Sequence, residues 1–139
     1  MITTRFAVKS DTDFWFSLDA HLQMDELKRK IRDNMAYIIE ENGEPIGIMR
    51  YNLFWDSIPF LTLIYLRGDK RGIGAGRTAV ERWESDMKKA NYGLLMTSTQ
   101  ADEQAQYFYR KLGFKDIGGL VFDIPDYEQP LEIMLAKRI

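Results

Sequence analysis

The sequence contains no cysteine, and this absence excludes several kinds of chemistry at once. Without cysteine the chain forms no disulfide bond and offers no thiolate as a nucleophile or as a metal ligand. His21 is the single histidine among 139 residues, so a metal site built from several histidines is excluded as well. Only carboxylate-rich metal sites would remain, and we expect no metal.

The sequence also lacks a long apolar run and a strong charge of either sign. No apolar stretch approaches the roughly 20 residues that span a bilayer, and residues 1–10 show no apolar core typical of a signal peptide. Nineteen basic residues stand against 21 acidic ones, a net charge of −2, which disfavours a general nucleic-acid binder or a membrane-surface protein. We therefore expect a cytoplasmic protein with no nucleic-acid partner and no membrane partner.

The composition is typical of one compact domain. Hydrophobic residues make up 45% and charged residues 29%, and no linker, repeat or charge block divides the chain, so we predict a single domain over residues 1–139. Apolar periodicity predicts strands at 2–8, 35–40, 45–54, 60–67, 94–98, 114–122 and 131–137. It predicts helices at 13–20, 24–34, 79–90 and 102–112.

The order of these elements predicts a mixed sheet flanked by helices. Asn42-Gly43 is a hairpin turn, so the strands on either side of it are antiparallel. The strands at 60–67 and 94–98 enclose a glycine-rich loop and a helix, which makes a βαβ unit with parallel strands. The almost continuous apolar run at 60–67 favours a strand buried on both faces. The fold class is therefore α/β (mixed α+β), with a mostly antiparallel sheet of six to seven strands and about four helices.

The glycine-rich loop is the strongest candidate for a binding site. Gly72, Gly74 and Gly76 let backbone amides approach a ligand closely, and the helix that follows presents a partial positive charge at its start. The flanking cations are Arg67, Lys70, Arg71 and Arg77, against the single acid Asp69, so the stretch carries +3 in a negative chain. This pattern predicts an anion site. A tight turn with solvated charges is the alternative.

Two well-known phosphate loops fit this segment poorly. A Walker loop needs glycine where Arg71 stands and lysine where Arg77 stands. The dinucleotide pattern Gly-x-Gly-x-x-Gly/Ala matches Gly74, Gly76 and Ala79, but too few residues follow to complete two βαβαβ halves. A nucleotide hydrolase is therefore disfavoured.

A third pattern fits better. The segment Arg71-Gly-Ile-Gly-Ala-Gly76 resembles the Arg/Gln-x-x-Gly-x-Gly/Ala pyrophosphate loop of the GCN5-related N-acetyltransferase (GNAT) superfamily. Residues 105–114 resemble the helix of that family that ends in Ala-x-x-Phe-Tyr-x-x-x-Gly-Phe. The two motifs occur in the family's order, and the resemblance covers nearly the whole chain.

The resemblance implies that acetyl-CoA is the co-substrate and that its acetyl group passes directly to an amine. It places cofactor contacts on one strand (Ile64, Tyr65, Leu66), on the loop (Arg71, Gly72, Ile73, Gly74, Ala75, Gly76, Arg77) and at Asp102. Many relatives have asparagine at the position of Asp102, which puts that contact in doubt. A backbone amide near Leu66 would bind the oxyanion of the thioester carbonyl.

Tyr109 occupies the family's general-acid position. A phenol has an ordinary pKa of about 10 and is therefore protonated at neutral pH, so it can supply a proton to the departing CoA thiolate. A core aromatic is the alternative. Ala105, Phe108 and Leu112 already share one apolar helix face, which favours the acid role over packing for Tyr109.

The acceptor side is predicted from aromatic and polar residues that border the cofactor strand or lie in the first helical region. They are Trp15, Asp19, His21, Tyr51, Trp55 and Asp56, a set that suits a cationic or amphipathic amine. Core packing is the alternative for Trp15 and Trp55. Neither of the strands at 60–67 and 94–98 carries a carboxylate, so the general base stays open, with Asp56 and His21 as candidates.

Two classes of function remain after these arguments. The first is an N-acetyltransferase acting on a small-molecule or peptide amine. The second is a non-catalytic acyl-CoA-binding or sensing domain, which the missing strand carboxylates favour and Tyr109 disfavours. Because dimers are common among relatives, a homodimer is a further expectation.

Overall fold

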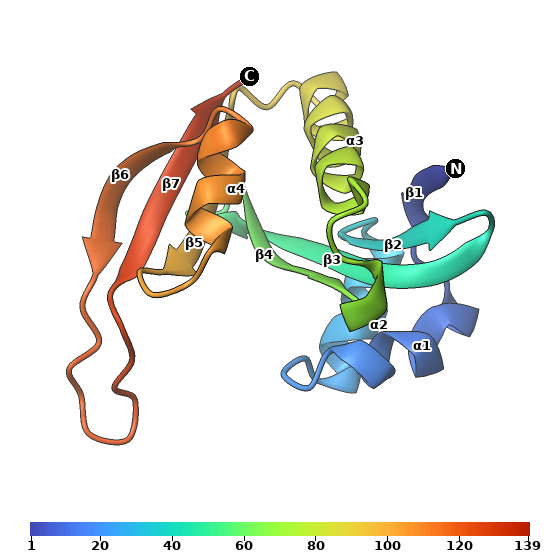
Figure 1. Ribbon diagram of the computed structural model, residues 1–139, viewed down its shortest axis with the longest axis horizontal. Coiled ribbons are helices and arrows are strands. Elements are labelled where there is room, and N and C mark those ends of the chain that lie inside the picture. Colours follow the sequence, from blue (N-terminus) through green and yellow to red (C-terminus); the bar gives the residue numbers. More distant parts are fainter. The chain divides into compact units, whose positions relative to one another are not determined.

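The computed structural model describes all 139 residues, which form four helices and a seven-stranded sheet (Figure 1). The strands are β1 (Ile2–Phe6), β2 (Ala36–Glu41), β3 (Glu44–Phe54), β4 (Ile58–Leu66), β5 (Leu94–Gln100), β6 (Lys115–Leu120) and β7 (Glu132–Arg138). The helices are α1 (Thr12–Leu18), α2 (Met24–Arg32), α3 (Ala75–Lys89) and α4 (Ala105–Lys111), with short 3-10 helices η1 (Lys9–Asp11) and η2 (Gly68–Lys70). No helix is both long enough and apolar enough to cross a membrane.

The sheet order is β1-β2-β3-β4-β5-β7-β6. β4 and β5 pair in parallel, as expected for the βαβ unit, through Phe60–Met96 and Leu61–Thr97. The pairs β1–β2, β2–β3, β5–β7 and β6–β7 are antiparallel. The predicted mixed, mostly antiparallel sheet with four helices is therefore confirmed.

The chain forms two compact units, and each is described by itself. Unit 1 consists of residues 1–52 and 62–86, and unit 2 of residues 53–61 and 87–139. β4 and α3 each contribute residues to both units. The single domain over residues 1–139 stays a prediction, and one calorimetric unfolding transition would be its test.

In unit 1, α3 lies on one face of the strands, and α1 and α2 lie on the other (Figure 1). The alternation of side chains along a strand explains how both faces are filled. Ile48 joins the core beneath α1 and α2, where Trp15 and Leu27 are buried. Tyr51, three residues later on β3, contacts the ring of Trp83 on α3.

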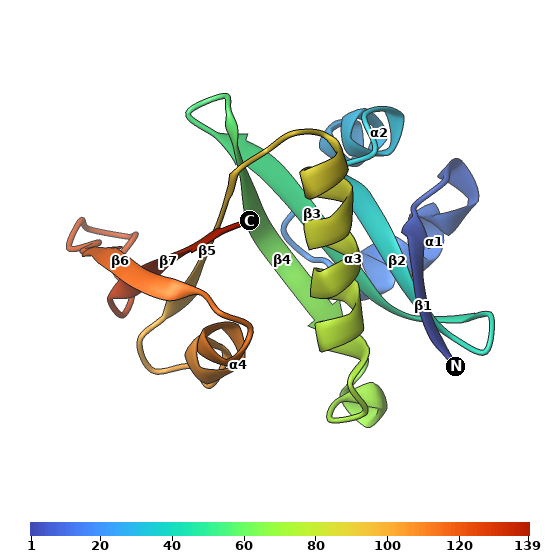
Figure 2. The same cartoon turned by 90° about the horizontal axis from the view of Figure 1, so that it is seen from above.

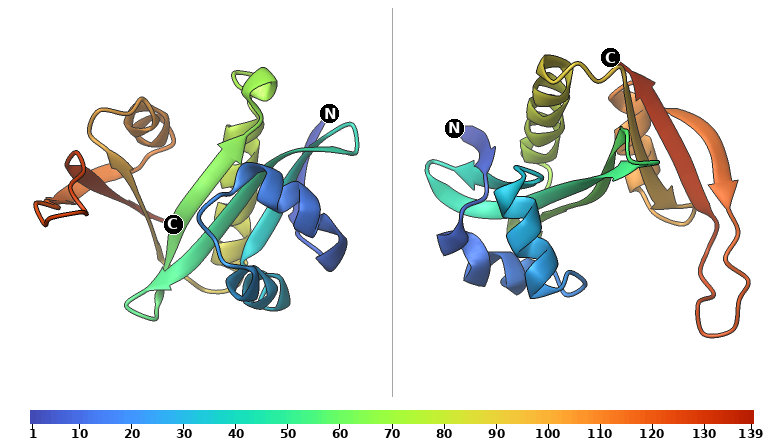
Figure 3. Two further views of the ribbon diagram at one scale, coloured as in Figure 1. Left: turned by 90° about the horizontal axis from the view of Figure 1, so that it is seen from below. Right: turned by 180° about the vertical axis from the view of Figure 1, so that it is seen from behind.

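In unit 2, α4 packs against β5 beside the β6–β7 pair (Figure 2). A small core forms around Met96 and Met134, with Phe60 packed against it. All six residues of β6 are exposed. The loop between β6 and β7, residues 121–131, extends beyond the ends of its strands (Figure 3).

Two sequence expectations about buried faces are wrong, the first for β4 and the second for α4. β4 is not buried on both faces, because Thr62 and Tyr65 are exposed. Both side chains have partners: the Thr62 hydroxyl bonds to Asn52, and the Tyr65 ring lies under the Arg71 guanidinium.

The helix expected at 102–112 is shorter than predicted, and its buried face is shifted by one residue along the sequence. α4 begins at Ala105, and its buried residues are Gln106 and Tyr109 rather than Ala105, Phe108 and Leu112. The cause is Gln106, whose Nε2 donates to the carbonyls of Ala101 and Glu103 at 2.9 Å each. These bonds satisfy a buried amide and keep residues 101–104 in a turn. Ala90 likewise lies outside α3 and is exposed.

Candidate active site

The glycine-rich loop adopts a backbone that requires glycine at two positions. Gly72 has φ +79° and Gly74 has φ +83°, both in the left-handed region. A Cβ at either position would meet no atom within 4 Å, so conformation rather than space demands glycine there. α3 starts immediately afterwards at Ala75.

The backbone amides of residues 72–77 donate to no acceptor within the protein. The first bonded amide is that of Thr78, which donates to the Gly74 carbonyl at 3.1 Å, and the Thr78 hydroxyl donates to the same carbonyl at 3.0 Å. The first turn of the 15-residue α3 contains no acidic residue that would neutralise its positive end. Six consecutive free amides ahead of a helix form a site for an anion such as a diphosphate.

The four cations near this loop are not equally available. Three of them are paired with carboxylates: Lys70 with Glu41 at 2.7 Å, Arg77 with Glu81 at 2.8 Å and Arg67 with Asp69 at 3.4 Å. Arg71 has no carboxylate partner, and its guanidinium lies 5.2 Å from the centroid of the Tyr65 ring. Arg71 is therefore the cation that can approach an anion without losing an ion pair.

The strand residues expected to contact the cofactor lie at the end of β4. Ile64 and Leu66 are half-buried, and Tyr65 is exposed. The sequence reasoning missed the contribution of Gly47 on β3, where a Cβ would lie 2.6 Å from Leu66 Cδ2 and 2.8 Å from the Tyr65 carbonyl oxygen. Glycine thus allows β3 to lie close against this segment of β4.

Tyr109 is buried in unit 2, with 5% of its surface exposed. Its ring makes edge contacts with Phe108 and Phe114, at centroid distances of 5.2 and 5.7 Å. Burial raises the pKa of Tyr109 to about 12, and the nearby Thr97 hydroxyl acts in the opposite direction. The phenol therefore keeps its proton throughout the neutral range.

Thr97 is a second residue that sequence reasoning missed. It is fully buried on β5, and its hydroxyl donates to the Leu61 carbonyl at 2.9 Å. The available clue was that Thr97 follows three apolar residues on its strand, because a hydroxyl buried with them needs a hydrogen-bond partner. Asp102, by contrast, is exposed in the turn after β5.

Asp19 is the centre of a buried polar network in unit 1. Its Oδ2 accepts from the Trp15 indole at 3.1 Å and from Arg50 Nε at 3.0 Å, and its Oδ1 accepts from the amides of His21 and Leu22. Burial alone would raise the pKa of Asp19, but the His21 amide and the Arg50 charge outweigh it and lower the pKa below its ordinary value. The carboxylate thereby fixes the segment between α1 and α2.

Lys30 was not singled out from the sequence, yet it is buried. Its Nζ donates to the Tyr51 carbonyl at 2.7 Å. Desolvation, with a contribution from the charge of Arg50, lowers the pKa of Lys30. Its position three residues after Leu27 on α2 places it on the apolar helix face and could have revealed it.

The predicted acceptor residues fall into two groups. Trp15, Asp19 and the backbone of His21 lie together in unit 1, and the His21 residue itself is exposed. Trp55 and Asp56 lie in unit 2, in the turn before β4, where both are exposed and have positive φ. Trp55 packs on Phe54 at a centroid distance of 4.8 Å.

The side chain of Tyr51 belongs to neither group. It is buried against Trp83, with ring centroids 5.8 Å apart, on the α3 face of the sheet. No cluster of three or more His, Cys, Asp or Glu side chains is arranged to hold a metal ion.

Comparisons with known proteins agree with this arrangement. Residues 5–114 match the profile of the acetyltransferase (GNAT) family. A search of curated protein sequences gives no significant match.

Solved structures share the fold at low sequence identity. The ribosomal-protein-alanine N-acetyltransferase from Brucella melitensis is 18% identical with a TM-score of 0.82, and the match covers 99% of both chains. The ribosomal-protein-S18-alanine N-acetyltransferase from Escherichia coli is 18% identical with a TM-score of 0.78, covering 100% of this chain and 94% of that one. Naa50 from Arabidopsis thaliana, in complex with the bisubstrate analogue CoA-Ac-MVNAL, is 14% identical with a TM-score of 0.80 over 99% of each chain.

The family match covers most of the chain, and the loop of free amides fits the co-substrate that the family uses, acetyl-CoA. The chain belongs to the GNAT family of acetyl-CoA-dependent N-acetyltransferases.

Proposed function

We propose that this chain transfers the acetyl group of acetyl-CoA directly to a primary amine of its acceptor. The observation that carries the proposal is the run of unbonded amides at residues 72–77, ahead of α3 and beside Arg71. These groups match a diphosphate in charge and in hydrogen-bonding capacity, since each free N–H can donate to one phosphate oxygen.

The remaining cofactor contacts follow the same family pattern. Main-chain groups of Ile64, Tyr65 and Leu66 bond the amides of the pantetheine arm, and the amide of Leu66 donates to the thioester oxygen as negative charge develops there. Asp102, exposed in the turn after β5, supplies one polar contact. Arg71 approaches the diphosphate as an unpaired guanidinium.

The chemical step forms a C–N bond and breaks a C–S bond, and it is accompanied by loss of a proton from the amine and protonation of the sulfur. The acceptor nitrogen attacks the thioester carbonyl carbon, the C–S bond breaks, and the sulfur leaves as the thiolate of CoA. Tyr109 acts as the general acid. Because its pKa of about 12 lies above the ordinary thiol value of about 8.5, the phenol stabilises the developing thiolate mainly by donating a hydrogen bond, and the proton that it passes to the sulfur is replaced from solvent. The amine loses its proton to water or to a base, for which His21 and Asp56 are the candidates.

The acceptor is proposed to be a small-molecule or peptide amine. Two of the structural relatives are named for modifying ribosomal proteins, and a third holds a peptide-bearing bisubstrate analogue, which supports the peptide class. Exposed Trp55, at 79%, with Asp56 beside it offers an aromatic face and a carboxylate to a cationic amine. Buried Trp15 and Asp19 position the α1–α2 segment rather than touch the acceptor.

Thiol release from acetyl-CoA, measured with a panel of small amines and of peptides with free amino termini, tests the proposal. We expect release that depends on both the enzyme and the amine, with an acetylated product of matching stoichiometry. Binding of CoA without turnover on any amine would favour a non-catalytic acyl-CoA-sensing domain instead.

A further inference from the structure

The side chains of Arg71 and Tyr65 meet in a cation–π contact. The guanidinium carbon of Arg71 lies 5.2 Å from the centroid of the Tyr65 ring, within the roughly 6 Å at which an aromatic face attracts a cation. Both residues belong to unit 1, and Tyr65 is 40% exposed. In the proposed function Tyr65 contributes main-chain groups alone, so its ring has no role there.

The chain between these two residues is tied to neighbouring strands of unit 1. The Arg67 amide donates to the Ile46 carbonyl of β3 at 2.9 Å. At the end of η2, the Lys70 amide donates to the Arg67 carbonyl at 2.9 Å, and the Lys70 ammonium pairs with Glu41 of β2 at 2.7 Å. These contacts fix the turn that leads from β4 to Arg71, so the backbone places the guanidinium relative to the ring.

An aromatic ring holds an arginine in a different way from a carboxylate. A carboxylate neutralises the guanidinium and occupies its N–H donors, as Glu81 does when it accepts from Arg77 Nε at 2.8 Å. A neutral ring attracts the guanidinium without neutralising its charge, and it presents no carboxylate oxygen to accept from the N–H donors. Arg71 is therefore restrained while its charge and its donors stay available to an anion.

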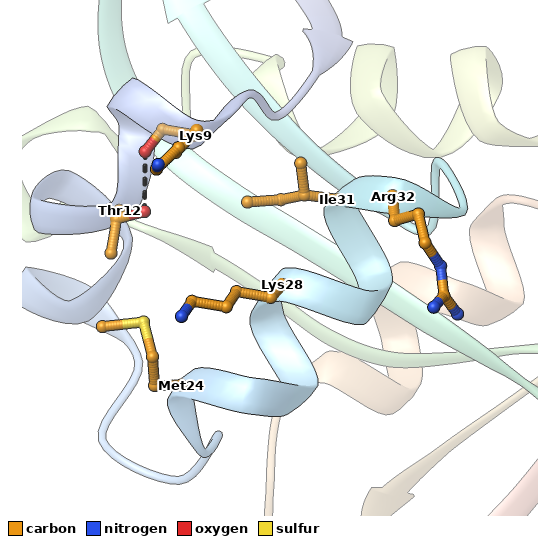
Figure 4. A pocket seen from close by; sticks show the side chains of 6 residues that line it. All are labelled: Lys9, Thr12, Met24, Lys28, Ile31 and Arg32. Carbon is orange, nitrogen blue, oxygen red and sulfur yellow. Dashed lines mark hydrogen bonds between the residues drawn. The ribbon is translucent and has the colours of Figure 1, made fainter.

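Other cations of the chain lack this combination. Arg110 on α4 lies 5.7 Å from the centroid of the Tyr107 ring, but its guanidinium also donates to both carboxylate oxygens of Asp116. Lys28 has no carboxylate partner, but it lies over no aromatic ring and lines a pocket of about 630 Å³ between the η1–α1 segment and α2 (Figure 4). Arg71 is both held by a ring and free of a carboxylate.

We propose that Tyr65 is a positioning residue, whose ring holds Arg71 ready to bind the diphosphate of CoA. The inference rests on the proposed function, because it takes the free amides of residues 72–77 as the diphosphate site. Arg71 directly precedes these amides, so its guanidinium adds a charged donor for the same ligand. A side chain that the ring already restrains loses less rotamer freedom on binding than an unrestrained arginine.

Calorimetry with CoA on the full chain tests the role of the ring. Tyr65→Leu removes the ring and is expected to raise the dissociation constant for CoA by about fivefold, in the range of one cation–π contact. Tyr65→Phe keeps the ring and is expected to bind CoA as the unmodified chain does. The matched control is Tyr107→Leu, which removes the ring beneath the carboxylate-paired Arg110 and is expected to leave the constant unchanged.

A double-mutant cycle with Arg71 separates positioning from direct contact with the coenzyme. In an Arg71→Met background the ring has no guanidinium to hold, so Tyr65→Leu is expected to cause no further loss of CoA affinity. Lys28→Met removes an unpaired cation outside the loop and controls for the loss of one positive charge. A ring that stacks on the coenzyme itself would weaken binding equally in both backgrounds, and that result would overturn the proposal.

Turnover gives a readout that a merely structural role would not produce. With acetyl-CoA as the donor, Tyr65→Leu is expected to raise KM and to leave kcat unchanged, since a contact with the diphosphate takes no part in the chemical step. A circular dichroism spectrum like that of the unmodified chain will show that the variant folds. Equal or tighter CoA binding by Tyr65→Leu would overturn the positioning role and leave the proposed cofactor site in place. Failure of the unmodified chain to bind CoA would overturn both.

Discussion

The two units of the chain use buried polar groups in different ways. Unit 1 buries a charged network in which Asp19 accepts from Arg50 and holds the segment between α1 and α2. Unit 2 buries neutral groups, the Tyr109 phenol and the Thr97 hydroxyl, beside a small core around Met96. A buried charged network fixes the backbone, but removing one partner lowers the free energy of unfolding strongly. A buried neutral phenol instead retains a proton that it can donate.

This comparison predicts its largest effect at Asp19. The variant Asp19→Ala leaves Arg50, whose side chain is 11% exposed, buried without its carboxylate. We expect the free energy of unfolding to fall by about 3–5 kcal/mol, as for other broken buried pairs. Urea denaturation is the measurement. The control is Asp33→Ala, which breaks an exposed pair with Arg32 and should leave stability unchanged within error. An equal effect of both variants would contradict the structural role of Asp19.

The next effect is expected on turnover rather than stability. Tyr109→Phe removes one hydroxyl and keeps the ring that contacts Phe108 and Phe114. We expect kcat to fall by about 100-fold, within the range for general acids, with CoA affinity nearly unchanged. Tyr107→Phe, on the same helix but 53% exposed, is the matched control. Because the pKa of Tyr109 is about 12, no descending limb due to this residue should occur below about pH 11.

A steady-state assay over neutral pH separates the two roles of Tyr109. Equal kcat values for the Tyr109→Phe variant and the unmodified enzyme would leave Tyr109 as a core aromatic alone. If Tyr109→Phe lowers kcat but also lowers stability as much as a core truncation does, Tyr109 would likewise be a core aromatic alone.

A smaller effect on the free energy of unfolding is expected when the pH is lowered. The pKa of Asp19 is lowered in the folded chain, so the folded state favours the carboxylate, and its contribution is present above the unfolded pKa of about 3.9. That contribution is lost as the pH falls through and below this value. Asp19→Asn should therefore lose less stability than the unmodified chain between neutral pH and pH of about 3. Parallel curves of unfolding free energy against pH would show that Asp19 is not responsible.

The sequence was sufficient to predict the features that depend on local chemistry. The glycine-rich loop followed by a helix was predicted from residue type and spacing, and the structure has both, although α3 begins at Ala75 rather than at residue 79. The hairpin at Asn42-Gly43 is likewise confirmed, with positive φ at both residues.

The sequence was insufficient where partners are distant in the chain. The burial of Asp19 depends on Arg50, 31 residues later, and the pairing of Lys70 depends on Glu41. The buried face of α4 was predicted one position away from Tyr109, because a polar Gln106 was not expected to be buried by its own hydrogen bonds. Such contacts are decided by the tertiary structure and have no local pattern.

The central claim is that backbone amides of residues 72–77 bind the diphosphate of CoA, and calorimetry with CoA tests it most directly. Gly74→Ala forces a side chain into φ +83°, while Gly43→Ala imposes the same strain at φ +85° in a hairpin turn remote in sequence, and neither new Cβ meets an atom within 4 Å. We predict that Gly74→Ala weakens CoA binding by about tenfold or more, since the amides lose their arrangement. Gly43→Ala should bind CoA as the unmodified chain does. Equal affinities for both variants, or no heat of binding for the unmodified chain, would contradict the account.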